Sequence, residues 1–341
     1  MNKCKFSIFM SLVLVLAVLG WTQNVFSWRD EPGCTQDKEF PVVTVNHLSY
    51  PSLDYKKTRD FYVDLLGFRV VWDDGTKCQV DIGDAYEPNS MYLTTGTAAN
   101  AGRLAHYGLG LPGFFALSAE LGAELVRRGF AGVRPDGQAG WFVNTPSGWV
   151  QHLTVVKDPC MFPGAATPCA VCPSAACTAA YQKGLQNLGS IPPPSGTGFT
   201  ALYFKYIILQ EPADVPHVRG TPYVPPWVAQ DADFYKSLMG MAVLSDREHD
   251  FWFDREDDVW LQFGQNTLVI RPAPAHGQPL PFTAPFINEF GFVVANYDPA
   301  KVKAELDRRG IPSKLNAFGG YEFLDPNGLV ISINGSIAGQ R

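Results

Sequence analysis

Short runs of apolar residues, separated by turn-forming residues, follow one another in a recurring order near the start of the chain. The run Val42 to Tyr50 predicts a strand, and Tyr55 to Leu66 has apolar residues at helical spacing and stops at Gly67. Strand-like runs follow at Phe68 to Trp72, Cys78 to Ile82 and Met91 to Thr95. The pattern predicts a β-α-β-β-β module.

The same order then starts again. Leu104 to Leu109 predicts a strand, and Phe114 to Arg128 predicts a helix that ends at Gly129. Further strands are predicted over Gly140 to Asn144 and Trp149 to Val155. The first half of the chain is therefore expected to hold two such modules.

Internal repeats show that this pair of modules is itself duplicated. The segment DFYVDLLG at 60–67 returns as DFYKSLMG at 233–240, and AELVRRG at 123–129 returns as AELDRRG at 304–310. The second copy differs at residues 210–229, where five prolines predict a surface loop between its first strand and first helix. The sequence predicts an α+β protein with two tandem domains.

The remaining segments set the domain boundaries at 41–157 and 199–336. Residues 158–198 hold four cysteines and a Pro-Ser-Gly run, which is typical of a linker. Residues 1–27 combine two lysines, an apolar run and a small-residue end, as a signal peptide does. We therefore expect a secreted or periplasmic protein; an uncleaved membrane anchor is the alternative.

Charge and cysteine content change this picture only in detail. The formal net charge of -6 becomes -8 without residues 1–27, which argues against nucleic acid or an anionic membrane as a partner. Six cysteines remain after cleavage, namely Cys34, Cys78, Cys160, Cys169, Cys172 and Cys177. An even count in an exported chain favours disulfide bonds, although the pairing stays open. The pair Cys169 and Cys172 has the alternative of forming half of a metal or redox site.

The order of these motifs resembles the vicinal oxygen chelate superfamily, which includes glyoxalases, extradiol dioxygenases and bleomycin resistance proteins. The resemblance rests on His47 in the first strand, the DFY and LLG motifs of the helix, and the late segment LDPNGLVI at 324–331. It covers most of residues 41–157 and 200–334. It implies paired βαβββ modules whose sheets surround a divalent metal, and a small-molecule substrate or ligand.

The resemblance also implies the metal ligands. His47 falls on the ligand position of the first strand, His106 on that of the second module, and His152 on the last-strand position, four residues after Gly148. Gln151 is the rival for the last position if the strand register shifts by one residue. Three neutral imidazoles favour Zn²⁺, Fe²⁺ or Mn²⁺.

In the second copy the same alignment gives Lys205, Glu289 and Ser332. A protonated lysine repels a cation, so this copy is expected to bind no metal, and Lys205 and Glu289 are candidates for an ion pair.

The resemblance implies metal-assisted lyase, isomerase or dioxygenase chemistry on a small oxygen-bearing substrate. The alternative is a non-catalytic protein that sequesters a small molecule, as bleomycin resistance proteins do. The sequence identifies no catalytic acid or base, no specific substrate and no oligomeric state.

Overall fold

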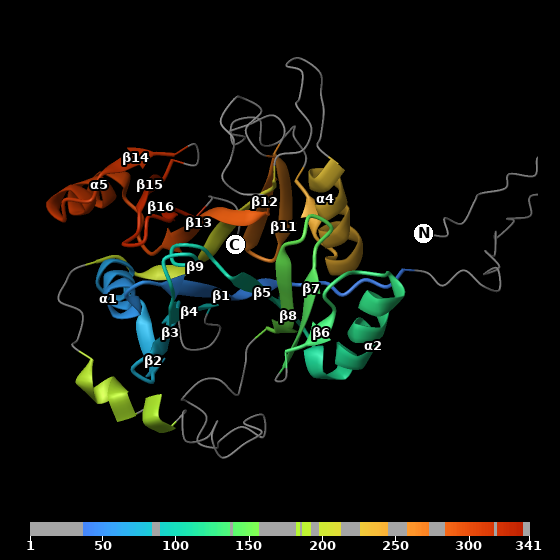
Figure 1. Ribbon diagram of the computed structural model, residues 1–341. Coiled ribbons are helices and arrows are strands. Elements are labelled where there is room, and N and C mark those ends of the chain that lie inside the picture. Colours follow the sequence, from blue (N-terminus) through green and yellow to red (C-terminus); the bar gives the residue numbers. More distant parts are fainter. Residues whose placement is uncertain are drawn as a thin grey trace, which may run out of the picture. The chain divides into compact units, whose positions relative to one another are not determined.

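The fold is organised by two mixed eight-stranded sheets (Figure 1). A computed structural model describes residues 37–83, 89–136, 139–156, 182–184, 186–191, 198–212, 226–244, 258–272, 284–316 and 319–336. The first sheet contains β1 (Thr44–Ser52), β2 (Arg69–Asp73), β3 (Lys77–Ile82), β4 (Asn89–Thr95), β5 (His106–Leu111), β6 (Arg134–Pro135), β7 (Gly140–Asn144) and β8 (Val150–Val155). Its helices are α1 (Tyr55–Leu66) and α2 (Phe114–Arg127).

The second sheet repeats this plan. Its strands are β9 (Ala201–Gln210), β10 (Ala242–Val243), β11 (Val259–Phe263), β12 (Asn266–Arg271), β13 (Phe286–Val294), β14 (Ser313–Leu315), β15 (Tyr321–Leu324) and β16 (Val330–Asn334). Its helices are α4 (Pro226–Met239) and α5 (Pro299–Arg308), and the short 3₁₀ helix η1 (Leu188–Ser190) precedes it.

The strand orders of the two sheets match position by position. They are β2-β3-β4-β1-β5-β8-β7-β6 and β10-β11-β12-β9-β13-β16-β15-β14. In each sheet the first strands of the two modules are central neighbours and run antiparallel, as β1 and β5 do. The predicted α+β fold of paired βαβββ modules is confirmed.

Local chemistry explains where α1 begins and ends. The side chain of Asp54 accepts a hydrogen bond from the backbone N–H of Lys57 at 3.0 Å, which caps the first turn. Gly67 ends the helix in the left-handed conformation, with φ of 66°. A β-carbon at Gly67 would lie 2.8 Å from the carbonyl oxygen of Phe199, so glycine is also needed for close packing against the start of the second sheet.

The two sheets share one hydrophobic core, and residues 39–341 form a single compact unit. Reciprocal amide contacts join their central strands. The backbone N–H of Val45 donates to Asn266 Oδ1 at 3.2 Å, and that of Phe204 donates to Asn89 Oδ1 at 3.3 Å. The matching pair of bonds satisfies buried backbone groups at the junction of the two sheets.

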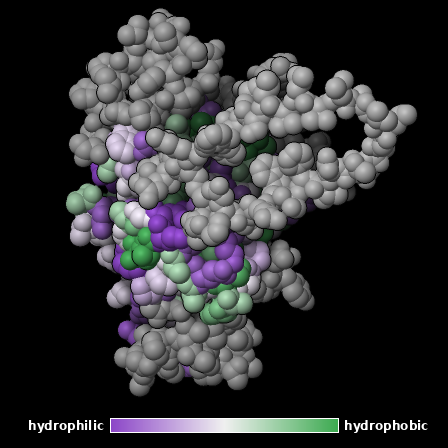
Figure 2. Space-filling view, turned by 90° about the vertical axis from the view of Figure 1, so that its right-hand side faces the viewer, coloured by the Kyte–Doolittle hydropathy of each residue, from purple (hydrophilic) through white to green (hydrophobic). Residues whose placement is uncertain are grey.

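On the side of the molecule drawn in Figure 2, the described surface mixes hydrophilic and hydrophobic residues. None of the helices within the described ranges is long and apolar enough to span a membrane.

Three expectations need correction or fall outside the described residues. The stretch 210–229 is not a loop throughout, because β9 extends to Gln210 and α4 begins at Pro226, where proline suits the first helical turn. Cys78 is a free, buried thiol in β3, so the even cysteine count did not predict its state. The other cysteines, residues 1–27 and most of the 158–198 linker lie outside the described residues.

Candidate metal centre

One cross-strand row of residues runs through the whole first sheet. From β2 to β6 it consists of Arg69, Asp81, Ser90, His47, Gly108, His152, Phe142 and Arg134. Partners in such a row project from the same face of a sheet, and so does His106, two residues before Gly108 on β5. Three strands therefore present their histidines on one face.

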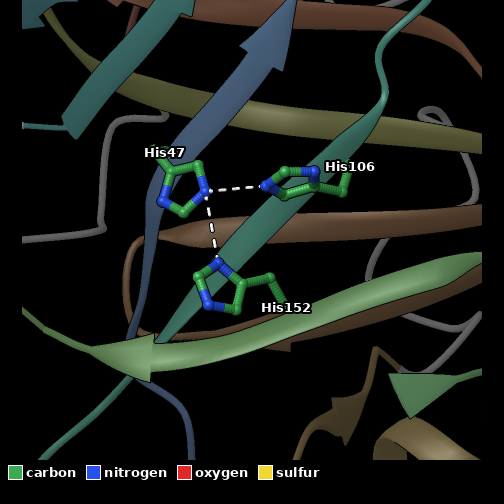
Figure 3. A group of neighbouring side chains, drawn as sticks. All are labelled: His47, His106 and His152. Atoms are coloured by element: carbon green, nitrogen blue, oxygen red, sulfur yellow. Dashed lines mark hydrogen bonds between the residues drawn. The ribbon is translucent and has the colours of Figure 1, made fainter. Parts of the chain in front are cut away.

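The three imidazoles converge (Figure 3). His47 Nε2 lies 3.2 Å from His106 Nε2 and 3.4 Å from His152 Nδ1. One ligand nitrogen of each ring lies within 4.8 Å of the others. His47 and His152 are almost fully buried, whereas His106 is partly accessible.

The orientation of His47 is fixed by its neighbour Asn46. The β1–β5 register shifts between Val45 and His47, which leaves Asn46 as the extra residue of a β-bulge. Its Nδ2 group donates to the carbonyl oxygens of Val155 and Val156 at 3.0 and 3.2 Å. Its Oδ1 atom therefore faces His47 Nδ1, at 2.7 Å, and accepts the ring N–H. The lone pair of His47 Nε2 is left directed at the other two rings.

His152 is held in a similar way by Asp136, whose carboxylate accepts a hydrogen bond from His152 Nε2 at 2.9 Å. The ring of Phe142 stacks on His152 with centroids 4.4 Å apart, and it meets His106 edge-on at 5.2 Å. A hydrogen bond from the outer nitrogen to a carboxylate is the usual support of a metal-binding histidine, because it fixes the tautomer and the ring plane.

Two glycines leave room for these rings. A β-carbon on Gly108 would lie 2.5 Å from His47 Cε1, and one on Gly140 would lie 2.0 Å from His152 Nε2. Any larger residue at either position would displace an imidazole.

The surroundings of two of the three rings favour the neutral form. Burial lowers the pKa of His47 well below its ordinary value, and the other two histidines lower it further. Burial lowers the pKa of His106 to about 3, with His152 and Arg134 as additional causes. Neutral imidazole is the form that binds metal.

This donor set fits a divalent cation. The outer nitrogens of His47 and His152 are bonded to Asn46 and Asp136, and their inner nitrogens, His47 Nε2 and His152 Nδ1, face each other at 3.4 Å, where both could bind one cation. Metal–nitrogen bonds of about 2.1 Å place neighbouring ligand nitrogens roughly 3.0 to 3.4 Å apart at octahedral and tetrahedral angles. Two of the three separations, 3.2 and 3.4 Å, fall in that range, and the third pair of ligand nitrogens lies within 4.8 Å.

The structure thus brings together the three histidines that the sequence proposed. Gln151 projects from the opposite side of β8, where its Nε2 group donates to the carbonyl oxygen of Tyr107 and its Oε1 accepts from Tyr235. Sequence reasoning did not find Asn46 or Asp136. The bulge that aims Asn46 and the turn that brings in Asp136 leave no periodic signal.

The equivalent row of the second sheet contains Tyr206, Gly291 and Ser332, which pair as His47, Gly108 and His152 do. Glu289, two residues before Gly291, corresponds to His106. The hydroxyl group of Tyr206 donates to Glu289 Oε1 and lies 2.6 Å from Ser332 Oγ. A phenol thus bridges the positions that carry imidazoles in the first sheet.

The alignment of Lys205 with His47 was wrong by one residue. Lys205 is the extra residue of the bulge in β9, and its Nζ atom donates to the carbonyl oxygen of Gly335 at 3.3 Å. It therefore corresponds to Asn46. Burial lowers the pKa of Lys205 to about 8 and raises that of Glu289 to about 7.

Comparison with known proteins places the fold. No family model matches the chain, and no curated protein matches its sequence. Among solved structures, a 2,3-dioxygenase from Pseudomonas sp. KL28 is similar with a TM-score of 0.55 and 13% identity, over 87% of this chain and 94% of that one. Homoprotocatechuate 2,3-dioxygenase from Arthrobacter globiformis has a TM-score of 0.56 and 13% identity, over 89% and 84%.

A Mn(II)-bound glyoxalase from Novosphingobium aromaticivorans is also similar, with a TM-score of 0.54 and 16% identity, over 87% of this chain and 83% of that one. These structures share the duplicated arrangement of βαβββ modules. The chain has the tandem fold of the vicinal oxygen chelate superfamily, as the sequence predicted.

Proposed function

We propose that this protein is a metal-dependent enzyme whose ion is held by His47, His106 and His152, and which acts on a small substrate with neighbouring oxygen atoms. The observation that carries the proposal is the convergence of three imidazole nitrogens, two of them with their other nitrogen bonded to an oxygen acceptor. The donor set suits Zn²⁺, Fe²⁺ or Mn²⁺. The ion would supply Lewis acidity at the substrate oxygens.

The side chains of the site have distinct tasks in this proposal. The three histidines hold the ion and, with only three protein ligands, leave positions for substrate. Asn46 and Asp136 keep the rings of His47 and His152 in the binding orientation. Phe142, stacked on His152, excludes water from one side of the centre.

Arg134 gives the site a positive charge that does not depend on the ion. It lies at the β6 end of the row, with its guanidinium group 4.6 Å from the centre of the Phe142 ring, and its charge contributes to the lowered pKa of His106. A substrate with an ionised oxygen would be attracted to this end of the sheet. Such oxygens are characteristic of catechols and of hemithioacetals after proton loss.

The fold comparison supports this substrate class. The similar structures include dioxygenases named for catechol-type substrates and a manganese-bound glyoxalase. Dioxygenase, lyase and isomerase chemistry are therefore the activities to test.

The test starts from the metal content of the purified full chain. We expect about one equivalent of divalent metal per chain, and turnover of one substrate class when Zn²⁺, Fe²⁺ and Mn²⁺ forms are assayed with catechols and hemithioacetals. His152→Ala should lose both metal and turnover, whereas Ser332→Ala, at the equivalent position of the second sheet, should keep both. Metal binding without turnover on any substrate would leave the sequestration function. Absence of bound metal in every reconstitution would contradict the proposal.

We also propose that the protein is exported, on the basis of the signal-like residues 1–27. Expression of the full chain should yield a mature protein in the periplasm or medium, with an N-terminus near residue 28 on terminal sequencing. Retention of residues 1–27 on a cytoplasmic product would contradict export.

A further inference from the structure

The two domains exchange equivalent contacts away from the histidine centre. In one of them, α1 of the first domain meets the turn between β15 and β16 of the second. Ser52 Oγ and Thr58 Oγ1 are 2.7 Å apart, Ser52 donates to Asn327 Oδ1 at 2.9 Å, and Asn327 Nδ2 donates to Thr58 at 2.9 Å. Three neutral side chains thus satisfy one another, and the one carboxyl group in the same turn, that of Asp325, accepts from Tyr50 and Tyr62 at 2.6 and 3.1 Å.

The internal repeat places different residues in the other contact. Glu211 follows Tyr206 by five residues, as Ser52 follows His47. Asp231 on α4 corresponds to Thr58, because both precede the DFY motif by two residues. Ser147 occupies the turn position of Asn327. Two neutral groups are therefore replaced by carboxyl groups at the same place in the fold.

Both carboxyl groups are completely buried, each at 0% exposure. Asp231 accepts hydrogen bonds from Thr145 Oγ1 at 2.8 Å, from Ser147 Oγ at 2.7 Å and from the backbone N–H of Ser147 at 2.9 Å. Neither oxygen of Glu211 has a hydrogen-bond donor in good geometry among the described residues, and the groups that act on its carboxyl group are Asp231 and Ser147. No ion pair within the described ranges includes Glu211 or Asp231.

Among the described residues, no cationic side chain balances the charge of this contact. A buried carboxylate needs a hydrogen-bonded or charged partner, since transfer of an unpaired charge from water costs several kcal/mol. The pKa of Glu211 is raised to about 9, mainly by burial and next by the negative charge of the adjacent Asp231. Either a proton or a cation has to balance the pair near neutral pH.

We propose that Glu211 and Asp231, with the hydroxyl groups of Ser147 and Thr145, form a second metal site, for Ca²⁺, at the contact between the two domains. All of its side-chain donors are oxygens, which hard cations prefer. Two carboxylates balance the charge of a divalent ion. Ca²⁺ fits better than Mg²⁺ because it accepts irregular sets of oxygen ligands, whereas Mg²⁺ demands near-octahedral geometry.

This site differs from the histidine centre in chemistry and in role. It has oxygen donors rather than nitrogen donors, and it draws on Ser147 after β7, on Glu211 after β9 and on α4. Binding there would stabilise the folded chain by joining elements of the two domains. The carboxyl pair must lose a proton to bind the cation, so binding should release about one proton near neutral pH.

The experiment uses the full chain after dialysis against a chelator. Calorimetric titration with CaCl₂ should show one binding event, with an enthalpy that depends on the ionisation enthalpy of the buffer. The Tm should rise with calcium concentration, as expected for a ligand that binds only the folded state. Glu211→Gln should abolish both responses, and Ser52→Ala, in the neutral contact, should leave them unchanged.

The contrary outcomes are equally definite. No calcium response in the wild-type chain would mean that the pair shares a proton only, and a response that persists in Glu211→Gln would place calcium elsewhere. If Glu211→Gln fails to fold, the double variant Glu211→Ser with Asp231→Thr serves instead, because it copies the neutral residues of the other contact. That variant should fold without calcium and show no response to it.

Discussion

The central rows of the two sheets have equivalent strand pairing but carry different side chains. In the first sheet, ring nitrogens of His47, His106 and His152 face one another, with glycine at Gly108 to make room. In the second, the ring of Tyr206 extends past Gly291 and its hydroxyl group lies between Glu289 and Ser332. In the second row, the hydroxyl group of Tyr206 thus occupies the position that a cation could occupy between the histidines of the first row.

This difference shows which part of the site belongs to the fold. The bulge, the glycine and the strand register recur in both sheets, so the fold supplies them. The residue at the bulge differs between the rows: Asn46 accepts the ring N–H of His47, whereas Lys205 donates to the carbonyl oxygen of Gly335. The chemical difference between the two rows therefore lies in three or four side chains on the same framework.

The largest expected effect is the loss of metal on removal of one imidazole. His106→Ala should abolish tight binding, because two nitrogen donors remain from a set of three. The measurement is metal content after dialysis, together with affinity from competition with a chromophoric chelator. Glu289→Gln is the matched control at the equivalent position, and it should leave the metal content unchanged. Equal affinity in His106→Ala and wild type would remove His106 from the site.

The second effect is a gain in the other sheet. Tyr206→His combined with Ser332→His would place two imidazoles beside the carboxyl group of Glu289, a donor set that suits Fe²⁺ and related ions. We expect a second equivalent of metal, bound more weakly than the first because Lys205 does not orient the new ring as Asn46 orients His47. Tyr206→Phe combined with Ser332→Ala is the control and should bind no second equivalent of metal. A double-histidine variant that still holds one equivalent would show that more than these side chains separates the two rows.

The fold and the three histidines could be predicted from the sequence, for identifiable reasons. The helix over Tyr55–Leu66 was predicted to the residue, from its apolar spacing and from Gly67 at its end. The duplicated motifs predicted the two matching sheets, and the spacing from Gly148 predicted that His152 lies beside the other two histidines. Local signals of this kind depend on nearby residues alone.

What the sequence did not give depends on structure across strands. The second copy carries extra residues between its first strand and the DFY motif, so counting back from that motif does not give the register, and His47 was aligned with Lys205 instead of Tyr206. The contact of His152 with Asp136 arises where a turn folds back over β8, and the pairing of Glu211 with Asp231 joins residues from separate elements. Neither contact has a spacing that repeats along the chain.

The third prediction compares the effects of the two bulge residues, Asn46 and Lys205, on metal affinity. Asn46→Ala should weaken metal binding by about 10- to 100-fold, the usual cost of losing a group that orients a ligand. Lys205→Ala removes the equivalent residue of the second sheet and should leave the affinity unchanged. Competition titrations on both variants give the answer. An effect of equal size in both would indicate general destabilisation, and thermal melts of the metal-free proteins would detect it.

The smallest expected effect is the pH dependence of stability that comes from Glu289 in the second sheet. Burial, as the largest cause, raises the pKa of Glu289 to about 7 from an ordinary value of 4.5. Between these values the folded chain holds more protons than the unfolded chain, so the stabilising contribution of Glu289 is complete below pH 4.5 and declines as pH rises to about 7.

Glu289→Gln removes this pH dependence of stability. Thermal melts at pH 5 and pH 8 should show a larger fall in Tm with pH for the wild type than for the variant, by a few degrees. A variant and wild type with the same pH dependence would mean that Glu289 titrates normally and that the phenol of Tyr206 does not enclose a perturbed carboxyl group.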